Sequence, residues 1–119
     1  MDNILIEKIK IIESWLIEKK AFDIISVDVS EKCSFTEYLI VCTGMATLHN
    51  RAIADYIVEK AHEHNIRILG KEGFTASTWI LLDLNDVIVH IFTSETRTMY
   101  QLEDLWTNRI KKQDIDNEN

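Results

Sequence analysis

Residues 79–92 read WILLDLNDVIVHIF, and this stretch decides the fold that the sequence predicts. Two apolar runs, Trp79–Asp83 and Val87–Phe92, lie on either side of a short turn that contains Asn85. Short apolar runs rich in β-branched residues favour strands, and Asn tolerates the positive φ that a tight turn requires. We therefore predict a β-hairpin whose two arms lie side by side in one sheet.

Helices and further strands surround this hairpin in the predicted pattern. Apolar residues recur at steps of three and four over residues 3–20, which is typical of an amphipathic helix. The continuous apolar run at 38–43 is typical of a strand that is covered on both faces. The predicted elements are helices at 3–20, 48–64 and 95–101, and strands at 23–29, 38–43, 66–70, 79–83 and 87–92.

The order of these elements predicts the fold class. Helix, two strands, helix, three strands, helix is typical of an α/β fold with a single mixed β-sheet of about five strands flanked by helices. Thr47 and Ser94 are the expected N-caps of the second and third helices. Asn65 is expected to end the second helix in a left-handed conformation.

A chain of 119 residues is most simply one domain with a sizeable core. Leu102, Leu105 and Trp106 continue the helical spacing toward residue 112. Residues 113–119 read QDIDNEN, which is typical of a frayed acidic tail. The sequence thus predicts a single domain over residues 1–112 and a disordered tail over 113–119.

The net charge is −7 and the isoelectric point is about 5.0. This charge disfavours broad nucleic-acid binding, which depends on Lys and Arg side chains, and it suits a basic protein partner. No basic leader precedes an apolar segment, and no apolar run approaches the length of a membrane span. We expect a cytoplasmic protein whose two cysteines stay reduced.

Residues that carry chemistry do not form a convincing catalytic set. Thr43 and Gly44 after a strand resemble the turn of nucleotidyltransferases, but residues 46–54 contain no carboxylate to hold a metal ion. Asp83 and Asp86 beside a tight turn are expected to point mostly to solvent, and His90 to be a hydrogen-bonded core residue. No catalytic residue, cofactor or metal is therefore predicted.

Three large aromatic side chains and one methionine leave two interpretations open. Trp79, Met99, Tyr100 and Trp106 lie beside polar residues, as anchors of protein interfaces often do. Plain core packing is the other interpretation, and the sequence alone does not separate the two.

Several motifs taken together resemble the ribosomal silencing factor family, which is also called Iojap-like. The resemblance spans roughly residues 5–107, and Asn85 stands where the family usually has Gly. The motifs that carry it are residues 28–30 (DVS), 33–44 (CSFTEYLIVCTG), 52–55 (AIAD), 72–73 (EG), 79–92, and 95–106 (ETRTMYQLEDLW).

This resemblance implies a non-enzymatic binding protein with a nucleotidyltransferase-like fold that lacks the active site. Family members bind a protein of the large ribosomal subunit at the face that meets the small subunit, and so they sterically block subunit joining and repress translation. The contact surface is expected on the sheet around the hairpin. Its predicted partner-binding residues are Lys71, Glu72, Trp79, Leu81, Asp83, Met99 and Tyr100.

Two alternatives stay open at this point. The chain is also compatible with a divergent nucleotidyltransferase-fold enzyme or nucleotide-binding protein. A homodimer that uses the apolar surface as its own interface is equally compatible with the sequence.

Overall fold

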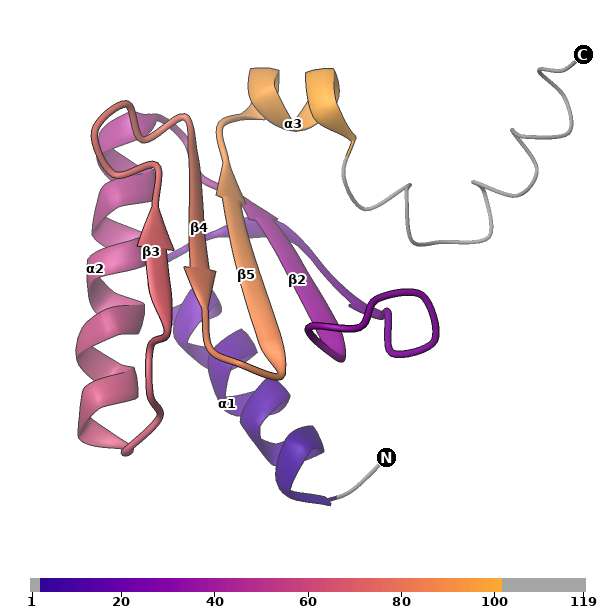
Figure 1. Ribbon diagram of the computed structural model, residues 1–119. Coiled ribbons are helices and arrows are strands. Elements are labelled where there is room, and N and C mark those ends of the chain that lie inside the picture. Colours follow the sequence, from indigo (N-terminus) through magenta and orange to yellow (C-terminus); the bar gives the residue numbers. More distant parts are fainter. Residues whose placement is uncertain (1–2, 102–119) are drawn as a thin grey trace, which may run out of the picture.

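Five strands form one mixed sheet in the order β1-β2-β5-β4-β3 (Figure 1). The computed structural model describes residues 3–101. Neighbouring strands are antiparallel except β2 and β5, which run parallel. The strands are β1 (Phe22–Asp28), β2 (Tyr38–Thr43), β3 (Gly70–Glu72), β4 (Trp79–Asp83) and β5 (Val87–Phe92). The predicted fold class, an α/β fold with one mixed five-stranded sheet, is confirmed.

Two long helices, α1 (Asn3–Glu18) and α2 (Thr47–Glu63), cover one face of this sheet (Figure 1). The apolar stripe of each helix packs on side chains that alternate along the strands, such as Ile80 and Leu82 of β4. Burial of this apolar surface is the main stabilising contribution to the fold. The short third helix, α3 (Ser94–Tyr100), follows β5 at the end of the sheet.

The opposite face of the sheet, here called the second face, carries a smaller apolar cluster. Val29, Leu39, Val41, Ile88 and Phe92 are its buried members, and no residue of α1 or α2 belongs to it. Strand β2 contributes to both clusters, because successive side chains of a strand point to opposite faces. The prediction that residues 38–43 are covered on both faces is confirmed, since five of these six residues are buried.

The predicted strand at 66–70 is wrong in its position, because β3 spans Gly70–Glu72. Ile66 and Ile68 pack their side chains against the core, which is why their pattern resembles a strand. The backbone N–H of Ile66 instead bonds to the carbonyl of Ala61 at the end of α2, so it is not available to a sheet ladder.

Both predicted N-caps are displaced by one residue. Ala46 caps α2 without any side-chain hydrogen bond, and Thr47 is already helical. Thr93 caps α3 through its side chain, which accepts from the backbone N–H of Thr96, and Ser94 is the first helical residue. Asn65 does take a positive φ of 59° just after α2, as predicted.

The predicted helical continuation through Leu102, Leu105 and Trp106, the tail at 113–119 and the domain boundary at 112 lie outside the described residues. Within residues 3–101, no helix has the length and apolar character that crossing a bilayer requires.

Candidate protein-binding face

Strand β4 presents three of the predicted partner-binding residues on the second face. Trp79, Leu81 and Asp83 alternate with the fully buried Ile80 and Leu82, which point into the helix-covered core. Because the side-chain period of a strand is two, the three residues form a row. The Cα atoms of neighbouring members of this row are about 7 Å apart. All three are half-buried, so each has a surface that a partner can reach.

Strand β5 holds this row in place from one side. In the antiparallel register, Trp79 lies opposite Phe92, Leu81 opposite His90, and Asp83 opposite Ile88. The Trp79 and Phe92 rings stack with their centroids 5.0 Å apart. The indole N–H of Trp79 also donates to Nδ1 of His90 at 2.9 Å. Trp79 is therefore fixed in one orientation before any partner arrives.

His90 is the hydrogen-bonded core residue that the sequence predicts. Its side chain is buried, and burial lowers the pKa of the imidazole to about 4. The ring is neutral at neutral pH, and Nδ1 accepts from Trp79, so Nε2 carries the hydrogen. His90 thus adds no positive charge to the second face.

Gly73 fixes the loop that leads into Trp79. Its φ is +88°, a conformation that residues with a Cβ seldom adopt. A Cβ at this position would also lie 2.0 Å from the carbonyl oxygen of Trp79. Only glycine allows the two backbone segments to approach this closely.

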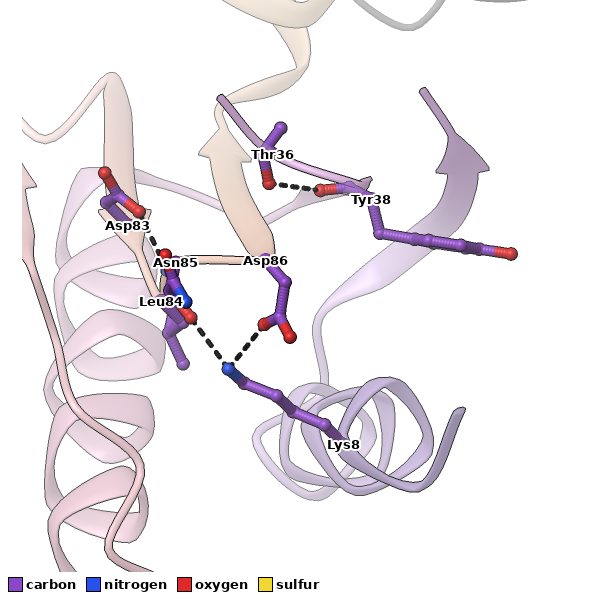
Figure 2. Close-up of polar contacts among 7 residues, drawn as sticks. All are labelled: Lys8, Thr36, Tyr38, Asp83, Leu84, Asn85 and Asp86. Carbon is purple, nitrogen blue, oxygen red and sulfur yellow. Dashed lines mark hydrogen bonds and ion pairs between the residues drawn. The ribbon is translucent and has the colours of Figure 1, made fainter. Parts of the chain in front are cut away.

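The hairpin turn orients the two aspartates differently (Figure 2). The Asp83 carboxylate accepts from the backbone N–H of Asn85 at 2.9 Å, and Asn85 has the predicted positive φ, 81°. The Asp86 carboxylate instead pairs with Nζ of Lys8 on α1 at 2.6 Å, and the same Nζ donates to the carbonyl of Leu84 at 2.7 Å. The prediction that both aspartates mostly face solvent is wrong for Asp86, because an α1 side chain reaches it.

Edge strand β3 separates the two predicted rim residues. Glu72 pairs with Leu81 and so lies on the second face, whereas Lys71 pairs with Leu82 and lies on the helix-covered face. There the ammonium of Lys71 sits 5.6 Å from the ring centroid of Phe74. The structure therefore brings Glu72, but not Lys71, to the row of β4 side chains.

Helix α3 supplies the last two predicted residues. The Tyr100 ring lies 4.7 Å from that of Trp79 and is 50% exposed, so it extends the aromatic cluster toward solvent. Met99, its neighbour on α3, is 70% exposed. Both side chains have the exposure that an interface anchor needs.

The strand side chains of the second face are acidic. Glu72 and Asp83 are their carboxylates, and Lys71, which is the one Lys or Arg of the five strands described in residues 3–101, lies on the other side of the sheet. Arg97 of α3 brings a guanidinium to this face, where it donates to Oγ1 of Thr43 at 2.8 Å. An apolar row flanked by carboxylates is complementary to a partner that combines apolar and basic side chains.

The groups that might carry catalysis are instead part of the packing. Burial raises the pKa of the Cys42 thiol to about 12, so the thiol stays protonated and unreactive. Next to Gly44 the Asn50 side chain fills the available space, because a Cβ on Gly44 would lie 2.0 Å from its Oδ1. No three metal-ligating side chains converge in the part of the chain that the structure describes.

One feature of the second face was not predicted as part of a site. A mainly apolar hollow of about 190 Å³ lies beside Leu81, between the strands and the loop that joins β1 to β2. Phe35 in that loop is 71% exposed and forms one wall of the hollow. A loop residue has no periodic signal, so only the fold places Phe35 beside Leu81.

The fold and this face define a class of protein: a small α/β module with an apolar and acidic binding face. A family model described as "Ribosomal silencing factor during starvation" matches residues 3–119. The chain belongs to the ribosomal silencing factor family, whose members are ribosome-associated regulators of translation.

Individual relatives agree with this assignment. The chain is 37% identical over 89 residues to ribosomal silencing factor RsfS of Bacillus subtilis, covering 75% of each chain. It is 32% identical over 108 residues to the mouse protein named mitochondrial assembly of ribosomal large subunit protein 1, covering 85% of this chain and 46% of that protein. A crystal structure of a Chromobacterium violaceum protein superimposes with a TM-score of 0.82 at 33% identity, covering 89% and 87% of the two chains.

Proposed function

We propose that this protein binds a protein of the large ribosomal subunit through its second face and sterically prevents the small subunit from joining, which represses translation. The observation that carries the proposal is the row of Trp79, Leu81 and Asp83 on one face of β4. These two apolar side chains and one carboxylate have fixed positions on a face of the sheet that α1 and α2 do not cover.

The composition of this face supports a basic protein as the partner. Ribosomal proteins must neutralise RNA phosphates, so their surfaces are rich in Lys and Arg. A face with Glu72 and Asp83 and no strand Lys or Arg in the described residues attracts such a surface and repels bare phosphate. The name of the mouse relative refers to the large subunit and supports the choice of subunit.

The preorganisation of Trp79 supports its role as the central anchor. A side chain that already has one orientation loses little conformational entropy when it binds. Tyr100 and Met99 extend the contact from α3, and Glu72 lies at its rim on β3. Lys71 remains a predicted rim residue, but we assign it a smaller contribution to binding. A partner would have to reach around the edge strand β3 to contact it.

The proposed mechanism is a steric block, with no catalytic step. A module that covers a subunit-joining surface needs affinity and bulk, and it acts in the compartment that holds the ribosomes, here the cytoplasm. Neither the buried Cys42 nor the packed Gly44 turn offers a reactive group for an enzymatic role.

Co-sedimentation with separated ribosomal subunits tests the proposal directly. The purified protein is mixed with large subunits, small subunits or joined ribosomes at low magnesium and then at a magnesium concentration that favours joining. We expect the protein in the large-subunit fraction and a smaller peak of joined ribosomes. Equal binding to both subunits, or to neither, contradicts the proposal.

A thermal-shift measurement with nucleotide and Mg²⁺ tests the alternative of a nucleotide-binding protein. We expect no change in Tm. A saturable rise in Tm with nucleotide would favour the alternative, because ligand binding to the native state raises stability by mass action.

A further inference from the structure

The hollow beside Leu81 is mainly apolar. It lies on the second face, and its volume is about 190 Å³. An apolar cavity of roughly 150 Å³ accommodates a benzene molecule, so this hollow has room for one large apolar side chain. Its lining residues are Val29, Cys33, Phe35, Thr36, Leu39, Leu81, Ile88 and His90.

The lining of this hollow is almost entirely without charge. His90 is its one ionisable imidazole, and burial lowers the pKa of that ring to about 4, so it is neutral at neutral pH. Thr36 turns its hydroxyl toward the carbonyl of Tyr38 (Figure 2). The wall formed by Phe35 is open to solvent, since that ring is 71% exposed. A charged or strongly polar ligand would lose its hydration here without replacement.

A second hollow adjoins the first and has the opposite character. Its volume is about 450 Å³, and it shares Cys33, Phe35 and Thr36 with the apolar hollow. Within residues 3–101, its charged lining residues are the carboxylates Glu37 and Asp86, and no Lys or Arg lines it. Glu37 is exposed, whereas Asp86 is held by Lys8. A basic group entering this hollow would meet Glu37 as its nearest unshared carboxylate.

We propose that the two adjoining hollows form one subsite of the contact with the large-subunit protein, which takes an apolar side chain in the hollow beside Leu81 and a Lys or Arg side chain next to Glu37. This inference rests on the proposed function, because Leu81 belongs to both the row on β4 and the hollow. The loop between β1 and β2 thus becomes the second side of the contact, with Phe35 as its anchor.

Charge decides which kind of partner fits the subsite. Phosphate of an RNA would be repelled by Glu37, whereas the charge of Asp86 is already paired with Lys8. It would find no basic side chain among the described residues of either lining. A second copy of this chain, with a net charge of −7, would mostly bring further carboxylates to the groove. A basic ribosomal protein supplies both an apolar side chain and a cation, so it is the partner that the linings favour.

Cys33 provides a chemical test of the subsite in the intact protein. It lines both hollows and is half-buried, whereas Cys42 is fully buried with its thiol pKa raised to about 12. We therefore expect N-ethylmaleimide to label Cys33 in the native state, which mass spectrometry verifies, and the added group to occupy the hollow. We expect labelling to weaken large-subunit binding by about tenfold or more, as loss of an anchor does.

Matched variants separate a filled subsite from a damaged fold. Cys33→Ser protein should bind large subunits equally well with and without the reagent, so it should lose the sensitivity that the parent protein shows. Phe35→Ala should weaken binding by about tenfold. Ile17→Ala is the control, because it also removes an exposed apolar side chain but from α1, and it should weaken binding by less than about twofold. Glu37→Lys should weaken binding, and Glu37→Gln should weaken it less. Circular dichroism and Tm should stay near the parent values for all five variants.

The outcomes distinguish the two proposals. If the parent protein binds no large subunits, the proposed function fails and the subsite fails with it. If the parent binds and both the labelled protein and Phe35→Ala bind equally well, only the subsite is overturned. If these changes instead dissociate a dimer in sedimentation velocity and leave ribosome binding intact, the occupant is a second copy and the proposed partner is wrong.

Discussion

The indole N–H of Trp79 donates a hydrogen bond to Nδ1 of His90, 2.9 Å away on the neighbouring strand. The bond requires an unprotonated Nδ1, so the aromatic cluster on the second face depends on the neutral form of His90. Burial already lowers the pKa of this ring to about 4, and the bond to Trp79 fits the same protonation state.

The first prediction follows from this dependence. In the unfolded chain His90 has an ordinary pKa of 6.5, and in the folded chain a pKa of about 4. Between these values the unfolded state binds more protons, so stability falls as the pH drops from about 6.5 toward 4. The loss attributable to His90 is on the order of 3 kcal/mol. Urea unfolding at a series of pH values measures it.

His90→Asn is the matched control for this pH dependence. Its Oδ1 can replace the Nδ1 acceptor, and the side chain does not titrate in this range. We expect the variant to lose most of the stability change between pH 6.5 and 4. An unchanged slope would show that other groups cause the pH dependence.

The second prediction concerns Trp79 as anchor. Trp79→Ala should still fold, and it should weaken large-subunit binding by about 2 kcal/mol or more, as hot-spot aromatics do. Trp79→Phe keeps a ring against Phe92 and Tyr100 but has no N–H for His90, so its binding should lie between those of the parent and Trp79→Ala. Circular dichroism and subunit pelleting test both. Loss of all folded structure in Trp79→Ala would mark the residue as core.

The third prediction separates the charge of Asp83 from its role in the turn. Asp83→Asn keeps an oxygen that accepts from the N–H of Asn85, so its Tm should match that of the parent. If a basic partner group pairs with Asp83, the large-subunit binding of Asp83→Asn should weaken by about 2 kcal/mol or more, because that group loses its counter-charge. Asp83→Lys should weaken binding further and should relieve inhibition of subunit joining in a translation assay. Parent-like binding by Asp83→Lys would remove the acidic contact from the proposal.

The fourth prediction concerns the ion pair that ties α1 to the hairpin turn. Nζ of Lys8 satisfies both Asp86 and the carbonyl of Leu84, and its side chain is 17% exposed. Lys8→Met should lower the free energy of unfolding by about 1–3 kcal/mol, since hydrogen bonds to charged groups contribute more than neutral ones. Lys10→Met, at an exposed position of the same helix, is the control and should change it by less than about 0.5 kcal/mol. Equal effects of the two changes would mean that the pair contributes nothing.

The fifth prediction concerns the loop before Trp79. Gly73→Ala should destabilise the fold by about 2 kcal/mol or more, because φ is +88° and the new Cβ would meet the Trp79 carbonyl. At Gly70 the nearest atom to a new Cβ is 3.9 Å away, so Gly70→Ala should be tolerated. Thermal unfolding compares them. A tolerated Gly73→Ala would show that the loop can relax away from Trp79.

The hairpin illustrates how well local pattern predicts local structure. The residue types in this stretch favour few conformations other than two strands and a tight turn. They correctly predict both arms, the turn and the positive φ of Asn85. Residues 66–70 illustrate the limit, because Ile66 and Ile68 have the side chains of a strand while the backbone at Ile66 bonds to the end of α2. Side-chain pattern reports burial, and burial alone does not specify the hydrogen-bond partners of the backbone.

The sequence by itself determined the fold class, the family and the row on β4, since alternation along one strand places Trp79, Leu81 and Asp83 on one side. Only the tertiary structure decided which residues join that row. The pairing register of β3 sends Glu72 to the second face and Lys71 to the other, and the chain path after β1 brings Phe35 beside Leu81. A one-residue shift in register would exchange Lys71 and Glu72, and the contacts that fix the register come from residues distant in the sequence.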